Sequence, residues 1–380
     1  MMHALIDPLV IETVTRLCKT EIPKYQSDEH YNTIPRSLFT AMCEAGLGGL
    51  SIPEEYGGIG ASAITSAAVF ETISRYDIGP AIFLSVHAMV SGLIARHGSE
   101  EQKRSYLPKL ASGELLAAFA LTEPHAGSDT AAQTTEATVG PEGFALNGSK
   151  CYITSAGFAD IYLTFAKTED DATSGLSGFI VPASASGLSW GSPERKMGAE
   201  LSPIASLFFD NAILPKSALL GALHGGRKVA LSGLAGGRVN IAACANGLSR
   251  AAIEDSLAYM KERHQFGKAL VDFQGLQFMV ADMHTKLAAA QLLTSNAAYD
   301  IDAFTNGDTA RNTKLSSSTA KCFATDAAMA ITTDAVQLFG GAGYIKDYTV
   351  ERYMRDAKML QIVEGTNQIQ RVIIARELIE

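Results

Sequence analysis

The stretch Leu115-Leu-Ala-Ala-Phe-Ala-Leu121 marks the point at which the chain changes from helical to strand periodicity. It is a continuous apolar run of strand length, and it follows Gly113, a residue type that commonly ends helices. Comparable short runs, rich in aromatic and branched residues, follow at 161–166, 178–181 and 205–209. The sequence therefore predicts a β region that begins near residue 119.

Turn signals separate these runs. Asn147-Gly148 predicts a hairpin turn, and prolines punctuate the region at positions 141, 182, 193, 203 and 215. The pattern predicts an antiparallel β domain of sandwich or barrel type over residues 119–222.

On the amino-terminal side, residues 9–118 have helical periodicity, apart from a loop rich in Pro and Gly at 51–60. On the carboxy-terminal side, long helices are predicted at 239–263, 274–302, 313–339 and 350–362, with a final helix after them. Leu276, Val280, Met283, Leu287 and Ala290 keep a three-four spacing, and small residues at 242–247 permit close helix approach, as in an antiparallel four-helix bundle. The predicted fold class is α+β, mainly α, with domains 1–118, 119–222 and 223–380.

Composition excludes several classes of function. The 380 residues are 47% hydrophobic and 19% charged, and the net charge of -9 argues against a nucleic-acid partner. The longest apolar stretch, 81–95, falls short of the roughly 18 residues that span a bilayer, so no membrane segment is expected. The amino terminus lacks the pattern of a signal or transit peptide, which predicts a cytoplasmic protein. The five cysteines form no Cys-x-x-Cys pair, as expected of reduced thiols packed as small hydrophobes.

Two apparent motifs carry little weight. Gly187-Leu-Ser-Trp-Gly191 has the spacing of a nucleophile elbow, but Ser192-Pro193 follows it in place of a helix. Gly221-Ala-Leu-His-Gly-Gly226 has the glycine spacing of a phosphate loop, but Arg227-Lys228 follows in place of Lys-Ser/Thr. The histidines occur singly, so no metal site is predicted.

Glu364 is the candidate catalytic base. It follows the apolar residues Leu360, Ile362 and Val363, whose surroundings would raise a carboxyl pKa toward the range of a base at neutral pH. Gly365 permits a tight turn directly after it, and Thr366 can cap the final helix. The alternative is a glutamate that flanks a helix and faces water, and the stretch alone leaves both interpretations open.

Two segments of the β region end in polar loops, Phe119-Ala-Leu-Thr-Glu-Pro-His-Ala-Gly-Ser-Asp129 and Cys151-Tyr-Ile-Thr-Ser-Ala-Gly157. They suit two walls of one pocket, although loop residues that satisfy their own backbone explain each segment equally well. Lys261-Glu-Arg-His-Gln-Phe-Gly-Lys268, Gln337-Leu-Phe-Gly-Gly-Ala-Gly-Tyr344 and the stretch Met354–Arg371 follow in that order. Taken together, and over essentially the whole chain, these segments resemble the acyl-CoA dehydrogenase family.

The resemblance implies non-covalently bound FAD and α,β-dehydrogenation of an acyl-CoA thioester. A base removes the α-proton while the β-hydrogen leaves as hydride to flavin N5, and electron-transfer flavoprotein then accepts the electrons. The family fold has an amino-terminal helical domain, a middle β domain and a four-helix bundle, usually assembled as a homotetramer built from a dimer of dimers.

Carried over by position, Glu364 resembles the base of the straight-chain and short-chain members, where its own N–H helps hold the thioester oxygen. Other branches place the base directly before an arginine that resembles Arg238, but this chain has Gly237 there. The resemblance assigns substrate contacts to Ser128, Arg238 and Gly365. It assigns FAD contacts to Leu121, Thr122, Ser128, Tyr152, Thr154, Thr366 and Gln368, and, from a neighbouring subunit, to Arg263, Phe266, Gln337, Gly340 and Gly341.

The chain departs from the family pattern at His125, where glycine is usual, and at Gln265, where several relatives have threonine; Gln265 is therefore left out of the predicted site. Segments 85–89, 236–242, 320–326 and 343–348 most resemble isobutyryl-CoA dehydrogenases, which predicts a short or branched acyl group. The alternatives are a straight short- or medium-chain dehydrogenase, an acyl-CoA oxidase, and a helical scaffold without activity.

Overall fold

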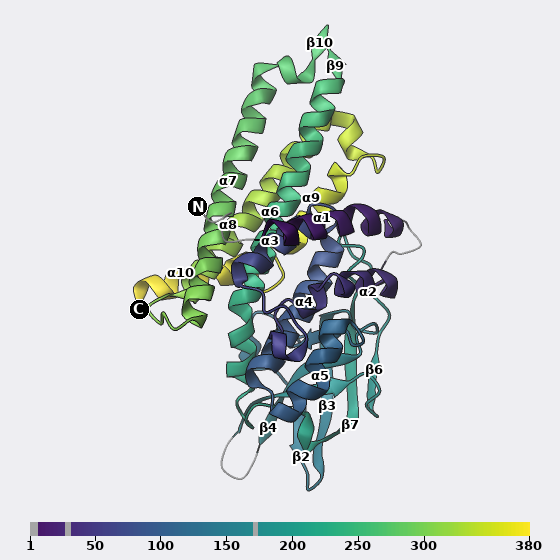
Figure 1. Ribbon diagram of the computed structural model, residues 1–380, viewed down its shortest axis with the longest axis vertical. Coiled ribbons are helices and arrows are strands. Elements are labelled where there is room, and N and C mark those ends of the chain that lie inside the picture. Colours follow the sequence, from purple (N-terminus) through teal and green to yellow (C-terminus); the bar gives the residue numbers. More distant parts are fainter. Residues whose placement is uncertain (1–6, 27–31, 170–173) are drawn as a thin grey trace.

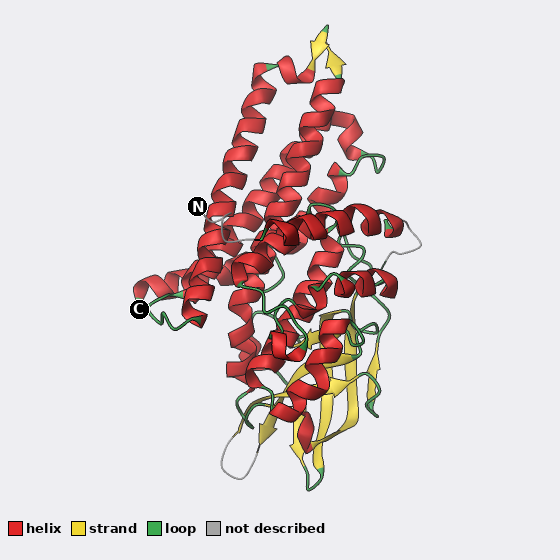
Figure 2. Ribbon diagram, viewed as in Figure 1, coloured by secondary structure: helices red, strands yellow, loops and turns green. Residues whose placement is uncertain are grey.

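The computed structural model describes residues 7–26, 32–169 and 174–380, and it has the predicted order of a helical part, a β part and a second helical part. The strands gather at one end of an elongated molecule, and long helices extend away from them (Figure 2). The predicted α+β class with its helical bundle is confirmed. Residues 1–6, which carry part of the argument against a signal peptide, lie outside the described residues.

The amino-terminal part contains α1 (Pro8–Glu21), α2 (Arg36–Glu44), α3 (Ala63–Ser74), α4 (Ile78–His97) and α5 (Glu100–Ser112). Ser99 and Gln102 form a capping box at the start of α5, and Gly113 ends that helix in the left-handed conformation. The loop 51–60 holds only a short 3₁₀ turn, Glu54–Tyr56, in agreement with its Pro and Gly content.

Helix α4 is long and apolar enough to cross a membrane by length and composition, but 94% of its most apolar window is buried inside the molecule. It packs against the strand β1 (Ala117–Ala120) and against the long helix α6 (Gly226–Glu262). Its polar His87 is also completely buried and is satisfied by backbone groups of three other segments. We therefore interpret α4 as the central core helix of the protein.

The sheet runs in the order β6-β7-β3-β2-β4-β5-β8, and β1 pairs with β4 beside this path. Most pairings are antiparallel, as predicted, but β1 and β2 each run parallel to β4. The strands are β1 (Ala117–Ala120), β2 (Glu136–Val139), β3 (Gly143–Thr154), β4 (Ile161–Glu169), β5 (Ser174–Pro182), β6 (Leu188–Trp190), β7 (Ile204–Pro215) and β8 (Leu219–Leu220).

The prediction of a hairpin turn at Asn147-Gly148 is wrong. Both residues lie inside β3, at a shift of its register with β7 between Leu146 and Gly148. A Cβ on Gly148 would lie 2.8 Å from the Cα of Thr135, so glycine is required by close backbone approach at a bulge. The hairpin between β2 and β3 instead turns at residues 140–142, where Gly140 N donates to Gly143 O over 2.8 Å.

The carboxy-terminal bundle consists of α6, α7 (Gln274–Thr305), α8 (Thr313–Phe339), α9 (Val350–Leu360) and α10 (Asn367–Ile379). A small hairpin, β9 (His264–Gln265) with β10 (Lys268–Ala269), joins α6 to α7 at the end of the molecule farthest from the sheet (Figure 1). Met283, Leu287 and Ala290 of the predicted three-four row are buried. The small residues of α6 also admit the amino-terminal part, because a Cβ on Gly247 would lie 2.1 Å from the carbonyl oxygen of Glu71 on α3.

Charged side chains join the three parts. Asp302 on α7 caps α3, accepting hydrogen bonds from Ala63 N (2.6 Å) and Ile64 N (3.1 Å). Asp356 on α9 accepts a hydrogen bond from Ala199 N in the β part over 2.6 Å. Arg352, also on α9, pairs with Asp77 at the start of α4 over 2.7 Å. The contacts of Asp356 and Arg352 fix α9, which leads directly into the turn that holds Glu364.

Candidate active site

Glu364 lies in a sharp turn between α9 and α10. It has a φ of 55° and Gly365 has a φ of 88°, so two successive residues are in the left-handed region. Thr366 then caps α10, as predicted, its hydroxyl accepting from Ile369 N over 3.3 Å. Left-handed backbone is unfavourable for a residue with a Cβ, and strained residues of this kind tend to cluster at functional sites. The sequence indicated the turn at Gly365 but not the strained conformation of Glu364.

The expected apolar flank does not bury this side chain. Of the three apolar residues before it, only Leu360 is buried, while Ile362 is 54% exposed. The carboxylate instead lies against α6, where a Cβ on Gly237 would be 2.8 Å from Oε2 and 3.0 Å from Cδ. Glu364 as a whole is half-buried, but its Oε2 is shielded from solvent and has no hydrogen-bond partner among the described residues. The carboxyl group therefore does not face water.

Two buried cations lie near the Glu364 carboxylate. Arg238, on α6, donates from Nη1 to Ser318 Oγ over 3.4 Å, and its Nε has no partner among the described residues. Lys321, on α8, is fully buried and donates from Nζ to Gly365 O over 2.9 Å. Burial raises the pKa of Glu364, and Arg238 and Lys321 oppose that rise. The arrangement suits a carboxylate that accepts a proton in a site shielded from water.

Lys321 is not among the site residues predicted from the sequence. A signal for it does exist, because Lys321 is the only charged residue between positions 315 and 325, among small, hydroxyl and apolar side chains of α8. This pattern indicates a buried lysine only when it is known that other elements pack against the face of α8 that carries Lys321.

The two polar loops of the β part are in contact with each other. Cys151 N donates to Thr122 O over 2.9 Å, which joins the two loops directly. Tyr152 has a φ of 56° and a side chain that is 67% exposed, and Thr154 is half-buried two residues later. Leu121 is half-buried beside Thr122. This surface therefore offers one exposed aromatic ring and several polar groups to a ligand.

His125 lies at the exposed tip of a tight turn between Glu123 and Ala126, whose backbones exchange hydrogen bonds of 3.3 and 3.1 Å. His125 is not among the residues with positive φ, so its position does not require the glycine that is usual in the family. Ser128, farther along the same loop, is exposed.

A buried ion pair between Glu123 and Lys150, which was not predicted from the sequence, holds this wall in place. Lys150 Nζ lies 2.7 Å from Glu123 Oε1, also donates to Leu121 O over 3.1 Å, and both charged side chains are almost inaccessible to solvent. Glu123 also accepts hydrogen bonds from Thr134 N (2.6 Å) and Thr135 N (3.0 Å). Burial opposes its charge, but Lys150 and these donors hold the pKa of Glu123 at about 2. Burial lowers the pKa of Lys150 to about 8, so the pair is ionised at neutral pH.

A second group of predicted residues gathers at the far end of the bundle. Arg263, Gln337, Gly340 and Gly341 line one hollow of about 510 Å³. A Cβ on either glycine would meet nothing within 4 Å, so the backbone there is open to a ligand. The hollow is also lined by Gln265, a residue that does not belong to the predicted site.

Phe266 is 94% exposed at the tip of the adjoining β9–β10 hairpin. This end of the bundle is remote from the sheet within one chain (Figure 1). A single chain therefore does not bring these residues to the wall formed by Thr122 and Tyr152.

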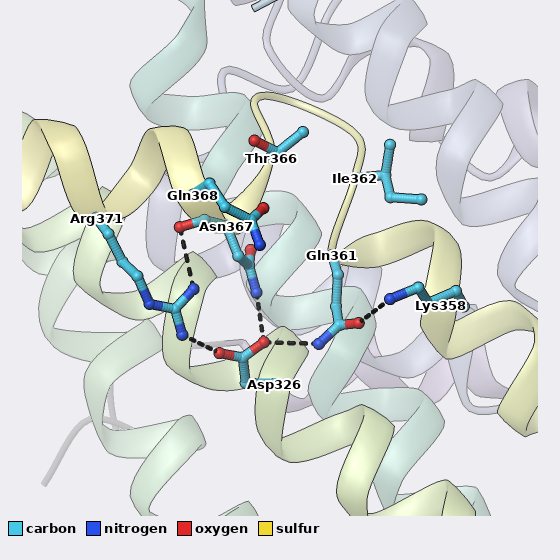
Figure 3. Close-up of a pocket in the computed structure, with 8 residues that line it drawn as sticks. All are labelled: Asp326, Lys358, Gln361, Ile362, Thr366, Asn367, Gln368 and Arg371. Atoms are coloured by element: carbon cyan, nitrogen blue, oxygen red, sulfur yellow. Dashed lines mark hydrogen bonds and ion pairs between the residues drawn. The ribbon is translucent and has the colours of Figure 1, made fainter.

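Thr366 and Gln368 line a separate hollow of about 380 Å³ between α8, α9 and α10. Asp326 is the centre of its polar network, accepting from Gln361 and Asn367 over 2.7 Å each and pairing with Arg371 over 2.6 Å (Figure 3). Thr366 lies at the opposite side of the hollow from that network (Figure 3).

Two separate surfaces of the chain each have groups that suit one part of a flavin dinucleotide. The wall of the β part offers an aromatic ring and polar groups, and the distal hollow offers open glycine backbone together with the cation Arg263. The buried Glu364 Oε2 and Arg238 Nε have no partners among the described residues, so polar atoms remain available to a bound molecule. Within the part of the chain that the structure describes, no cluster of three potential metal ligands occurs.

Comparisons with known proteins agree along the whole chain. The amino-terminal, middle and carboxy-terminal domain models of acyl-CoA dehydrogenases match residues 8–114, 118–212 and 224–379. An acyl-CoA dehydrogenase of Bacillus subtilis is 43% identical, covering 100% of this chain and 99% of that protein. A mitochondrial isobutyryl-CoA dehydrogenase of Dictyostelium discoideum is 37% identical, covering 93% and 84%.

Among solved structures, butyryl-CoA dehydrogenase from Megasphaera elsdenii matches with a TM-score of 0.92 and 36% identity, covering 98% of this chain and 97% of that one. Solved relatives include complexes with FAD and with FADH2. The chain therefore belongs to the acyl-CoA dehydrogenase family, a family of oxidoreductases that use FAD.

Proposed function

We propose that this protein dehydrogenates a short or branched acyl-CoA, of the size of isobutyryl-CoA, to the 2-enoyl-CoA, with Glu364 as the base. The observation that carries the proposal is the Glu364 carboxylate, which is shielded from water against Gly237 and lies near two buried cations. Relatives named isobutyryl-CoA and butyryl-CoA dehydrogenases support a four-carbon acyl group.

Glu364 takes the α-proton on its buried carboxylate. Exclusion of water favours the transfer, because burial raises the pKa of the carboxyl group toward neutral pH. The backbone N–H groups of Glu364 and Gly365 take part in none of the hydrogen bonds of the described residues, and they are available to the thioester oxygen as negative charge develops there. Bound FAD supplies the acceptor for the β-hydrogen, which leaves as hydride.

We assign the cofactor residues to two surfaces. Leu121, Thr122, Ser128, Tyr152 and Thr154 form the wall beside the flavin, with substrate contacts from Ser128, Arg238 and Gly365. Arg263, Phe266, Gln337, Gly340 and Gly341 serve the FAD of a neighbouring subunit, and their distance from the wall in one chain supports that assignment. Thr366 and Gln368 complete the contacts. The same proposal includes a homotetramer located in the cytoplasm, with electron-transfer flavoprotein as the electron acceptor. It also includes the division of the chain into domains 1–118, 119–222 and 223–380.

Anaerobic titration of the FAD-loaded protein tests the substrate. We expect isobutyryl-CoA and butyryl-CoA to bleach the flavin absorbance at lower concentrations than 2-methylbutyryl-CoA or octanoyl-CoA. Glu364→Gln should bind FAD and bleach almost not at all, because an amide cannot accept the α-proton. A variant that bleaches at the wild-type rate would refute the base, and a preference for octanoyl-CoA would refute the short acyl group.

A separate measurement addresses the electron acceptor. After reduction by substrate, the flavin should be reoxidised slowly by air and faster once electron-transfer flavoprotein is added. Rapid reoxidation by oxygen alone would favour an acyl-CoA oxidase.

A further inference from the structure

Lys321 is a buried lysine that lacks a carboxylate partner within ion-pair distance among the described residues. Its Nζ donates instead to two neutral oxygens, Gly365 O and Asn367 Oδ1, each over 2.9 Å. Lysine is almost never fully buried unless it is paired, because burial of an ammonium group is unfavourable. Both acceptors belong to the turn and helix start that follow Glu364, so the position of Lys321 is tied to that turn.

The turn needs such support. Glu364 and Gly365 are both left-handed, and a residue with a Cβ stays in that conformation only where its surroundings hold it. Gln370, on α10 and fully buried, donates from Nε2 to Glu364 O (3.1 Å) and to Gly365 O (2.9 Å). Lys321 supplies a further donor to Gly365 O from α8. Two buried side chains on different helices thus hold the carbonyl groups of the strained turn.

Asn367 connects Lys321 to the rest of α8. Its Oδ1 accepts from Lys321, while its Nδ2 donates to Thr325 Oγ1 over 2.9 Å and to Asp326 Oδ1 over 2.7 Å. Asn367 is only 2% exposed, and Lys321 and Thr325 are fully buried, so the part of this network around the ammonium group is shielded from solvent. The ammonium group therefore has a fixed place beside the turn.

We infer that Lys321 is a positioning residue for the base: from α8 it holds the left-handed turn at Glu364 and places a fixed positive charge near the carboxylate. The inference rests on the proposed role of Glu364 and adds a residue that the resemblance did not assign.

The charged groups that face Glu364 are Arg238 on α6 and Lys321 on α8. Burial lowers the pKa of Lys321 to about 8, and Arg238 lowers it further, whereas Glu364, Cys322 and Asp326 oppose the fall. The ammonium group is therefore charged over the acidic limb of the profile. Burial raises the pKa of Glu364, and each cation opposes the rise, so removal of one ammonium group raises that pKa further. Because the base must be deprotonated to act, the acidic limb of the pH–rate profile then moves to higher pH.

The test compares kcat/KM against pH for FAD-loaded wild type, Lys321→Met and Lys321→Gln, with butyryl-CoA as the probe. Methionine keeps the length without charge, and glutamine also keeps an N–H donor. We expect the acidic limb to move upward by about one pH unit in both variants, which lowers the rate about tenfold at pH values on that limb. Lys321→Arg should restore most of the profile. Lys314→Met, which changes an exposed lysine on the same helix, is the matched control and should leave the limb unchanged.

An acidic limb that stays in place in FAD-loaded Lys321→Met and Lys321→Gln would overturn the inference, whatever their rates, because a merely structural lysine does not set the pKa of the base. If Lys321→Met does not retain FAD, the acidic limb of Lys321→Gln alone is used to test the inference. Glu364→Gln separates this result from the proposed function. If Glu364→Gln is active, Glu364 is not the base and the proposed function fails. If Glu364→Gln is inactive and the acidic limb of the lysine variants has not moved, only the role of Lys321 is refuted.

Discussion

Gly237 on α6 and Glu364 after α9 meet so closely that a Cβ on the glycine would lie 2.8 Å from the glutamate Oε2. Because Gly237 has no side chain, it leaves the space that the Glu364 carboxylate occupies. Gly237→Ala should displace the carboxylate and lower kcat about tenfold or more, since small misplacements of a catalytic group are costly. Rates under saturating substrate, with FAD content measured in parallel, check this expectation.

The neighbouring Gly236 provides the control, because a Cβ there meets nothing within 4 Å. Gly236→Ala should keep the wild-type rate and stabilise α6 by about 1 kcal/mol through helix propensity. Equal loss of activity in both variants would show that the packing at Gly237 does not matter.

The Glu123–Lys150 pair should be important for stability. Glu123→Gln leaves the buried ammonium group without its carboxylate, which typically costs about 3–5 kcal/mol, and the loop at Thr122 loses its anchor. We expect a lower denaturation midpoint and weaker retention of FAD. Glu114→Gln, which removes an exposed pair with Lys109, should cost no more than about 1 kcal/mol. Similar costs for the two variants would contradict the assignment.

His87 should make the protein less stable in mild acid. Its Nδ1 accepts from Ala117 N over 3.2 Å, so Nε2 carries the hydrogen that faces the carbonyl groups of Gly48 and Leu110. Burial lowers the pKa of His87 from 6.5 to about 4, so between these values the unfolded chain binds more protons than the folded one. This group alone should then remove about 2 kcal/mol of stability between pH 7 and pH 5.

Denaturant unfolding at the two pH values measures that effect. His87→Gln should be less stable at pH 7 but should show a smaller loss on going to pH 5. An unchanged pH dependence in the variant would mean that His87 is not the responsible group.

Asp302 should stabilise the contact between the bundle and the amino-terminal part. Its two oxygens accept from the first N–H groups of α3, and loss of such a cap costs about 1–2 kcal/mol. Asp302→Ala should lower the thermal midpoint, whereas Asp282→Ala, at an exposed site on the same helix, should not. A matching decrease in both variants would point to a general effect of charge on α7.

The sequence by itself determined the order of the parts and most of their elements. Apolar spacing predicted the long helices, α8 with its observed bounds among them, because the period of a helix is a local property. The same local logic found Gly365 and the Thr366 cap. The tertiary structure alone decided which distant segments meet: β1 beside β4, a bulge in place of a turn at Gly148, and Lys321 beside Gly365. It also placed the Glu364 carboxylate against Gly237, because burial depends on the helix packed across from a residue and not on its neighbours in the chain.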